Sequence, residues 1–264
     1  MTEMIRRLED VRPGDLYLGP IGGPLGIGIR AAQVIVDGGW RVGPLHVEHI
    51  GIVTEASVLH EGPTFLLDTG RYVKVPEGVP SERVFHPLGA QLYPTGIQTA
   101  PRMVQAMPRG AEEIPLSYEK HWTPRVAYAR IPEGYPGQAA DAAAIARLMV
   151  AEGVAYSFAS YAALALYRWG LKAPRLTEWI GRRREPIRPV GATDEFLGGP
   201  SGRKISLPVE AICSVLADQC WSLAGKRVMV GTAPQAVTPS QLGQRLLTGM
   251  EGVVWGWPAA HPYP

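Results

Sequence analysis

The residues of this sequence best suited to covalent chemistry are one late cysteine and one histidine in the first quarter of the chain. Cys213 stands in the run Ile-Cys-Ser-Val-Leu near the predicted start of a helix, and His49 opens the predicted strand His-Ile-Gly-Ile-Val. A free thiol has a pKa of about 8.5, which a helix N-terminus and a nearby imidazolium both lower. The sequence therefore predicts Cys213 as a nucleophile and His49 as the base that takes its proton.

The second cysteine and the other histidines fit these roles less well. Cys220 lies two turns deeper in the same predicted helix, 208–223, where the helix dipole no longer acts. The helical rise separates the two sulfurs by about 10 Å, too far for a disulfide, so two free thiols and a reducing environment are expected. His46, just before the histidine strand, is the alternative base. Two cysteines without neighbouring histidines predict no metal site, and no cofactor is expected.

A catalytic histidine also needs an acceptor that orients its second ring nitrogen. Asp68 is the best candidate, because Phe65 to Asp68 reads as the antiparallel strand next to the histidine strand. Glu61 and His60, in the connection between the two strands, are the alternatives.

These residues need a sheet and a helix to bring them together. Strands are predicted over 16–18, 46–53, 65–69, 72–75, 83–85, 125–131 and 227–230, and helices over 29–36, 138–152, 157–169 and 208–223, with a further helix after Thr238. This pattern predicts an α+β fold in which a small, mostly antiparallel sheet packs against helices. We expect one domain over 1–264, with an insertion or lid at 86–124 and an irregular segment at 172–206, both rich in proline.

Composition narrows the class of protein. The chain has 264 residues, 46% hydrophobic and 19% charged, enough for a sizeable core, and its net charge of +2 is too small for a dedicated nucleic-acid partner. No apolar run reaches the roughly 20 residues of a membrane helix, and the first residues do not read as a signal peptide. We expect synthesis in the cytoplasm, and export would use a route that the sequence does not show.

Two segments share single features with phosphate-binding sequences, but neither has the full pattern. The glycine-rich run 19–30 lacks the Lys-Ser/Thr of a phosphate loop and is better interpreted as a flexible loop beside an active site. The arginines at 182–184 and 188 form a short basic stretch that is more typical of a solvated loop.

The motifs taken together resemble the permuted branch of the NlpC-type papain-like cysteine hydrolases, which is related to the lecithin retinol acyltransferase group. The histidine precedes the cysteine, the reverse of the order in papain-type enzymes. The resemblance is carried by short stretches spread over most of the chain: Arg12 to Leu16, His49 to Val53, Leu66 to Thr69, Ala155 to Phe158, Ile212 to Ser214 and Thr238 to Ser240. Val215 stands where the family often has glutamate after Cys-Ser, and Asp68 where it often has glutamate or histidine.

The resemblance implies an acyl-transfer reaction through a thioester at Cys213, His49 and Asp68. Tyr156 would line the cleft or donate a hydrogen bond, and Ser214 with the start of the cysteine helix would support the oxyanion. The implied substrate is an amide in a cell-wall-type peptide. Two alternatives stay open: an acyltransferase or lipid hydrolase, and a structural or virion-associated binding module without turnover, as part of a larger assembly.

Overall fold

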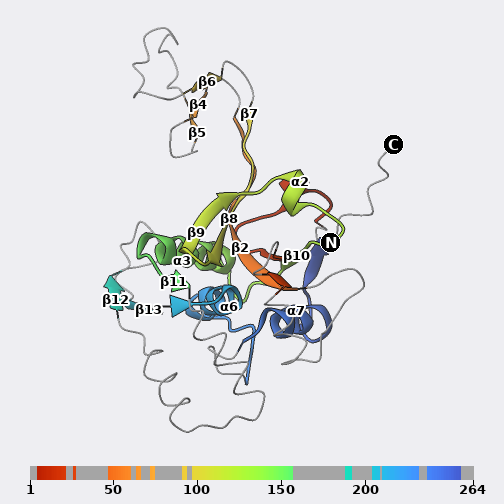
Figure 1. Cartoon of the computed structure of the whole chain (residues 1–264), viewed down its shortest axis with the longest axis vertical. Helices are drawn as coiled ribbons and strands as arrows, with labels where there is room; N and C mark the ends of the chain where they lie inside the picture. The colour runs from red at the N-terminus through yellow and green to blue at the C-terminus, as the bar shows by residue number, and fades with distance from the viewer. Residues whose placement is uncertain are drawn as a thin grey trace.

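The structure, a computed structural model, places these motifs on an α+β fold (Figure 1). The residues it describes are 5–21, 26–27, 47–60, 64–66, 72–74, 91–93, 97–156, 188–191, 204–208, 210–231 and 237–256. No helix within these ranges is both long and apolar enough to cross a membrane.

A six-stranded antiparallel sheet forms the centre of the fold. Its strands follow the order β15 (Val254–Gly256), β10 (Ala127–Arg130), β1 (Leu16–Gly19), β2 (His49–Glu55), β8 (Arg102–Met107) and β9 (Gly110–Pro115). Every neighbouring pair runs antiparallel. The expected α+β class with a mostly antiparallel sheet is therefore confirmed.

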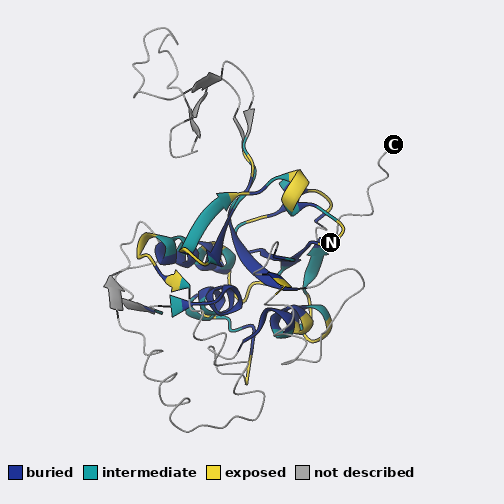
Figure 2. Cartoon of the chain, in the orientation of Figure 1, coloured by how far each residue is buried: buried dark blue, intermediate teal, exposed yellow. Residues whose placement is uncertain are grey.

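The two faces of the sheet are covered by different elements, because side chains alternate along each strand. On one face, Leu16, Leu18, Ile50 and Ile52 belong to a large apolar cluster with the helices α3 (Gln138–Ala151) and α6 (Cys213–Leu223), which we call the helical-face cluster. Figure 2 shows the buried sides of both helices against the sheet.

The opposite face carries a smaller, aromatic cluster. Tyr17 and Val53, which alternate with the residues of the helical face, pack there with Tyr128 and Trp122. The cover comes from Leu8 of the N-terminal 3-10 helix η1 (Leu8–Asp10) and from Leu116 and Trp122, which flank the short helix α2 (Tyr118–His121). We call this group the aromatic-face cluster.

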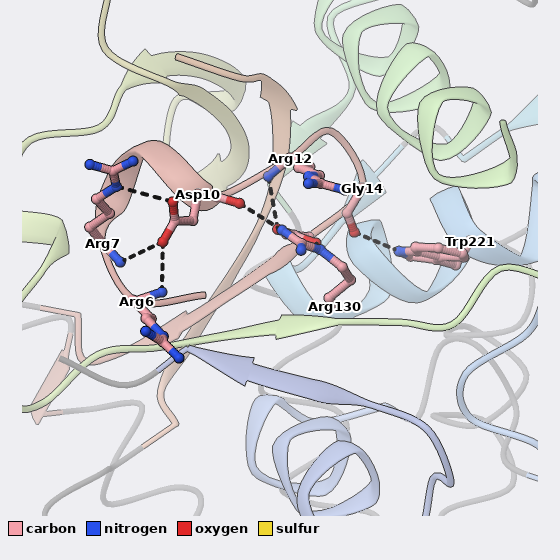
Figure 3. A network of polar contacts seen from close by, with 8 residues as sticks. Arg6, Arg7, Asp10, Arg12, Gly14, Arg130 and Trp221 are labelled. Carbon is pink, nitrogen blue, oxygen red and sulfur yellow. Dashed lines mark hydrogen bonds and ion pairs between the residues drawn. The ribbon is translucent and has the colours of Figure 1, made fainter. Parts of the chain in front are cut away.

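The turn before β1 joins the sheet to both long helices. Gly14 has a φ of +87°, and a Cβ there would lie 2.6 Å from the Cβ of Ala139 in α3, so the position requires glycine. The Gly14 carbonyl accepts a hydrogen bond of 3.1 Å from the indole N–H of Trp221 in α6 (Figure 3). The segment expected to lead into the first strand is thus fixed to the helix that carries both cysteines.

Two expected irregular segments contain regular structure. Residues 102–115 supply β8 and β9 of the central sheet, so the prediction of an insertion or lid at 86–124 is wrong for this part. Within 172–206, β12 (Arg188–Gly191) pairs with β13 (Lys204–Leu207). The strand expected at 227–230 is wrong, because these residues form a turn after α6.

The chain between β2 and β8 builds separate small sheets. β3 (Leu59–His60) pairs with β7 (Ile97–Gln98), and β4 (Thr64–Leu66) lies between β5 (Tyr72–Lys74) and β6 (Gln91–Tyr93). The strands expected at 65–69 and 72–75 therefore exist in outline, although they do not join the central sheet. The strand at 83–85 and the helices at 29–36 and 157–169 lie outside the described residues.

The C-terminal helix starts as its sequence predicts. Thr238 caps α7 (Pro239–Thr248): its hydroxyl accepts from the N–H of Gln241, the Gln241 side chain accepts from the N–H of Thr238, and Pro239 takes the first helical position. α6, by contrast, begins later than the expected 208, because β14 (Glu210–Ala211) pairs in parallel with β11 (Ala155–Tyr156) directly before it. This later start makes Cys213 the first residue of the helix.

Candidate active site

Cys213 occupies the helix start that a nucleophile needs. It is the first residue of α6, after Ile212 in an extended conformation, and it is only 1% exposed. The expected position of this cysteine in the first turn is confirmed. The backbone N–H groups of Ile50, Ser214 and Cys213 itself lie around the sulfur and favour its thiolate form.

Burial nevertheless dominates the titration of this thiol. Removal from water raises the pKa of Cys213 to about 11, against the opposing effect of the surrounding N–H groups. The resting protein therefore holds a neutral thiol at pH 7. A nucleophile of this kind needs a base to take its proton during the attack.

His49 is the first residue of β2 and is fixed through one of its two ring nitrogens. Nε2 lies 2.7 Å from Oε1 of Gln105, and Nδ1 is buried with no hydrogen-bond partner among the described residues. The ring packs edge-on against Tyr17, with centroids 6.3 Å apart. Burial lowers the pKa of His49 to about 4, so the imidazole is neutral at pH 7 with one nitrogen unoccupied.

The Cys213 thiol and the His49 ring lie near the start of β2 but on different faces of the sheet. The thiol lies by the N–H of Ile50, in the helical-face cluster, while the ring of the preceding residue, His49, lies with Tyr17 of the aromatic-face cluster. Both residues are described, and no hydrogen bond joins their side chains. Because consecutive strand residues point to opposite faces of the sheet, the ring and the sulfur lie on opposite sides of β2. Proton transfer between them therefore requires a movement that brings both groups to one side of the strand.

Gln105 occupies the place that the sequence assigned to Asp68. The neighbours of β2 are β1 and β8, whereas the strand expected to carry Asp68 pairs with β5 and β6. The predicted strand pairing behind Asp68 is therefore wrong, because the chain makes small sheets of its own before it returns as β8. The polar Gln105 within the otherwise apolar run Met-Val-Gln-Ala-Met is a local signal of an unusual position, but it does not identify His49 as the partner.

The alternative partners do not replace Gln105. His60 ends β3, which pairs with β7 outside the central sheet. Asp68, Glu61 and the alternative base His46 lie outside the described residues.

Tyr156 and Ser214, the two residues expected to support the site, differ in their position relative to the thiol. Tyr156, at the end of β11, is half-buried and near the thiol: burial and, to a lesser extent, the charge of Cys213 as thiolate raise its pKa. Ser214 is fully buried, and its hydroxyl donates a 2.6 Å hydrogen bond to the carbonyl of Val237. The Ser214 side chain is thus occupied, and only its backbone N–H faces the sulfur.

Cys220 provides an internal comparison for Cys213. Both thiols are free, and Cys220 lies in the core with its sulfur 3.9 Å from that of Met149. Burial raises the pKa of Cys220 further above its usual range than that of Cys213. The role of a buried apolar side chain fits Cys220.

No group of three or more His, Cys, Asp or Glu side chains suited to a metal ion occurs among the residues that the structure describes. Comparisons of the chain with protein-family models, with curated proteins and with solved structures each found no match. The arguments for function therefore come from the sequence motifs and the geometry of the site.

Because His49 is buried, the free energy of unfolding should depend on pH. The pKa of His49 is about 4 in the folded protein and 6.5 without burial, so between these values the unfolded chain binds a proton that the folded chain does not. The stability present above pH 6.5 is lost as the pH falls towards 4, by about 3 kcal/mol from this residue. Urea unfolding at pH 7.5 and 4.5 should show a smaller acid loss in His49→Gln than in the wild type, and equal losses would contradict this assignment.

Proposed function

We propose that this chain is a thiol-dependent acyl hydrolase with a circularly permuted papain-like arrangement, in which Cys213 is the nucleophile, His49 the base and Gln105 the residue that orients the base. The observation that carries the proposal is Nδ1 of His49, which has no hydrogen-bond partner among the described residues. It belongs to a ring whose other nitrogen is held by Gln105, next to the backbone N–H that faces the Cys213 thiol. Buried polar atoms without a hydrogen-bond partner are uncommon in native proteins.

The reaction follows from the roles of these groups. Once a movement has brought the ring and the sulfur to one side of β2, Nδ1 of His49 takes the thiol proton as the sulfur of Cys213 attacks the substrate carbonyl carbon. The N–H groups at the start of α6 stabilise the negative charge on the carbonyl oxygen. The protonated imidazole then gives its proton to the departing amine, and a thioester remains. Water attacks the thioester, His49 accepts a proton from it, and the acid leaves with the thiol regenerated.

The proposed substrate is an amide in a cell-wall-type peptide, on the strength of the resemblance to the NlpC-type hydrolases. Tyr156 is half-buried and close to the sulfur, and in this proposal it contacts the acyl group. A lipid ester or thioester would use the same chemistry.

Reaction with a small thiol-reactive electrophile at pH 7.5 tests the proposed pair. We expect faster modification of Cys213 than of Cys220, and at least about a tenfold loss of rate in His49→Gln, because general base assistance is worth more than this in enzymes. Mass spectrometry after digestion assigns the label to each thiol. Cys213→Ala identifies the remaining Cys220 signal, and Gln105→Ala should slow Cys213 to an intermediate rate.

Equal and slow labelling of both cysteines, unchanged by His49→Gln, would reject the hydrolase. It would favour the second candidate, a structural or binding module that has the same fold without turnover. One specific observation supports that candidate: both groups are almost fully buried and neutral at rest, and no hydrogen bond joins them.

A further inference from the structure

The side-chain amide of Gln105 lies between two polar partners. Its Oε1 is 2.7 Å from Nε2 of His49, and its own Nε2 donates a hydrogen bond of 2.9 Å to Oε1 of Glu112. Gln105 and Glu112 stand directly opposite each other on β8 and β9, so the contact is a cross-strand pair in the central sheet. A continuous line of hydrogen bonds thus runs from the half-buried Glu112 to the buried His49.

The chemistry of these groups allows one orientation of the amide. An ionised carboxylate accepts hydrogen bonds and donates none, so Glu112 requires the NH₂ group of Gln105. The amide oxygen must then face His49. Since a carbonyl oxygen can only accept, Nε2 of His49 must carry the ring proton.

This orientation also determines the free nitrogen of the ring. A neutral imidazole has one N–H and one lone pair, so a proton on Nε2 leaves the lone pair on Nδ1. Nδ1 is the nitrogen without a hydrogen-bond partner among the described residues. Among the residues that the structure describes, Gln105 is the one whose side chain holds a ring nitrogen of His49.

We propose that Glu112 is a positioning residue: through Gln105 it holds His49 in the tautomer with the proton on Nε2 and the lone pair on Nδ1. The inference rests on the proposed function only for the use of that lone pair as a base. The tautomer itself is a property of the folded protein and can be measured without turnover.

Nuclear magnetic resonance of the full-length chain with ¹⁵N-labelled histidine tests the proposal at pH 7.5. The His49 signals are identified by their disappearance in His49→Gln. In the wild type we expect Nε2 to show the shift of a protonated ring nitrogen and Nδ1 that of an unprotonated one. In Glu112→Ala the amide can turn over, so the two shifts should move toward each other as the tautomers mix.

Two further variants test whether Glu112 acts on the His49 tautomer through Gln105 or only through the loss of a charge on β9. Glu113→Gln removes the same charge from the adjacent position of β9, whose carboxylate instead contacts Thr54 and Arg147, and it should leave the His49 tautomer unchanged. The exchanged pair Gln105→Glu with Glu112→Gln restores an acceptor facing Nε2 and a donor behind it. This double variant should return the wild-type tautomer.

A wild-type spectrum with the proton on Nδ1 would overturn the proposal, as would an unchanged Nε2 proton in Glu112→Ala. Failure of the exchanged pair to restore the tautomer that Glu112→Ala loses would also overturn it. A correct tautomer combined with slow, His49-independent labelling of Cys213 would reject the hydrolase and leave the role of Glu112 intact.

Discussion

Replacing Asp15 by alanine is expected to lower the free energy of unfolding by about 3–5 kcal/mol, because it leaves a largely buried guanidinium without its main counter-charge. Asp15 is 2% exposed, and its two carboxylate oxygens accept from Nε and Nη2 of Arg130 at 2.9 and 2.8 Å. It also accepts from the N–H of Arg12. The carboxylate therefore joins the turn before β1 to the strand β10.

Urea unfolding followed by circular dichroism measures this loss, and a neighbouring ion pair supplies the control. Asp10 pairs with Arg7, whose side chain is 70% exposed, and exposed pairs contribute at most about 1 kcal/mol. Arg7→Ala, which removes only the exposed partner, should thus cost much less than Asp15→Ala. Asp10→Ala would also remove the hydrogen bonds that its carboxylate accepts from the N–H groups of Arg6 and Arg7. Similar losses in Arg7→Ala and Asp15→Ala would show that the buried pair contributes no more than the surface one.

Trp221→Ala is expected to lower the free energy of unfolding by about 3–5 kcal/mol, because it removes a large, fully buried side chain from the last turn of α6. The indole also donates to the carbonyl of Gly14. Trp221→Phe keeps most of the ring but leaves this carbonyl without its donor, so about 1–3 kcal/mol should be lost.

The same two variants report on the site, because α6 carries Cys213 at its first residue. A loosened helix exposes the thiol to solvent, so labelling of both Cys213 and Cys220 should accelerate in Trp221→Ala, in contrast to the selective loss expected for His49→Gln. If Trp221→Ala unfolds at the same urea concentration as the wild type, the indole does not stabilise the contact between α6 and the turn before β1.

Local sequence signals were sufficient for much of the fold. The alternation around His49, the helical spacing in 138–152 and the Thr-Pro pair at 238–239 each specify an element through its own residues, and each element is present. The start of α6 was placed too early because the short β14 depends on pairing with the distant β11, which no local pattern reveals.

The partner of His49 could not be predicted for a similar reason. Hairpins usually join consecutive strands, and this expectation led to Asp68. The chain instead forms other small sheets before β8 returns beside β2, so Gln105 reaches the ring from 56 residues away. Only tertiary pairing identifies that residue, whereas Cys213 and His49 were identifiable from their own local settings.

The edge of the central sheet has a consequence for biosynthesis. β15 pairs with β10, and Gly256 also bridges to Ile5, so residues from both ends of the described chain lie side by side. Contacts over such long separations form slowly and require most of the polypeptide. While the ribosome is still translating residues before 254, the nascent chain has an open strand edge at β10. The native sheet is therefore completed after synthesis of this last strand, and until then a chaperone has an exposed edge to recognise.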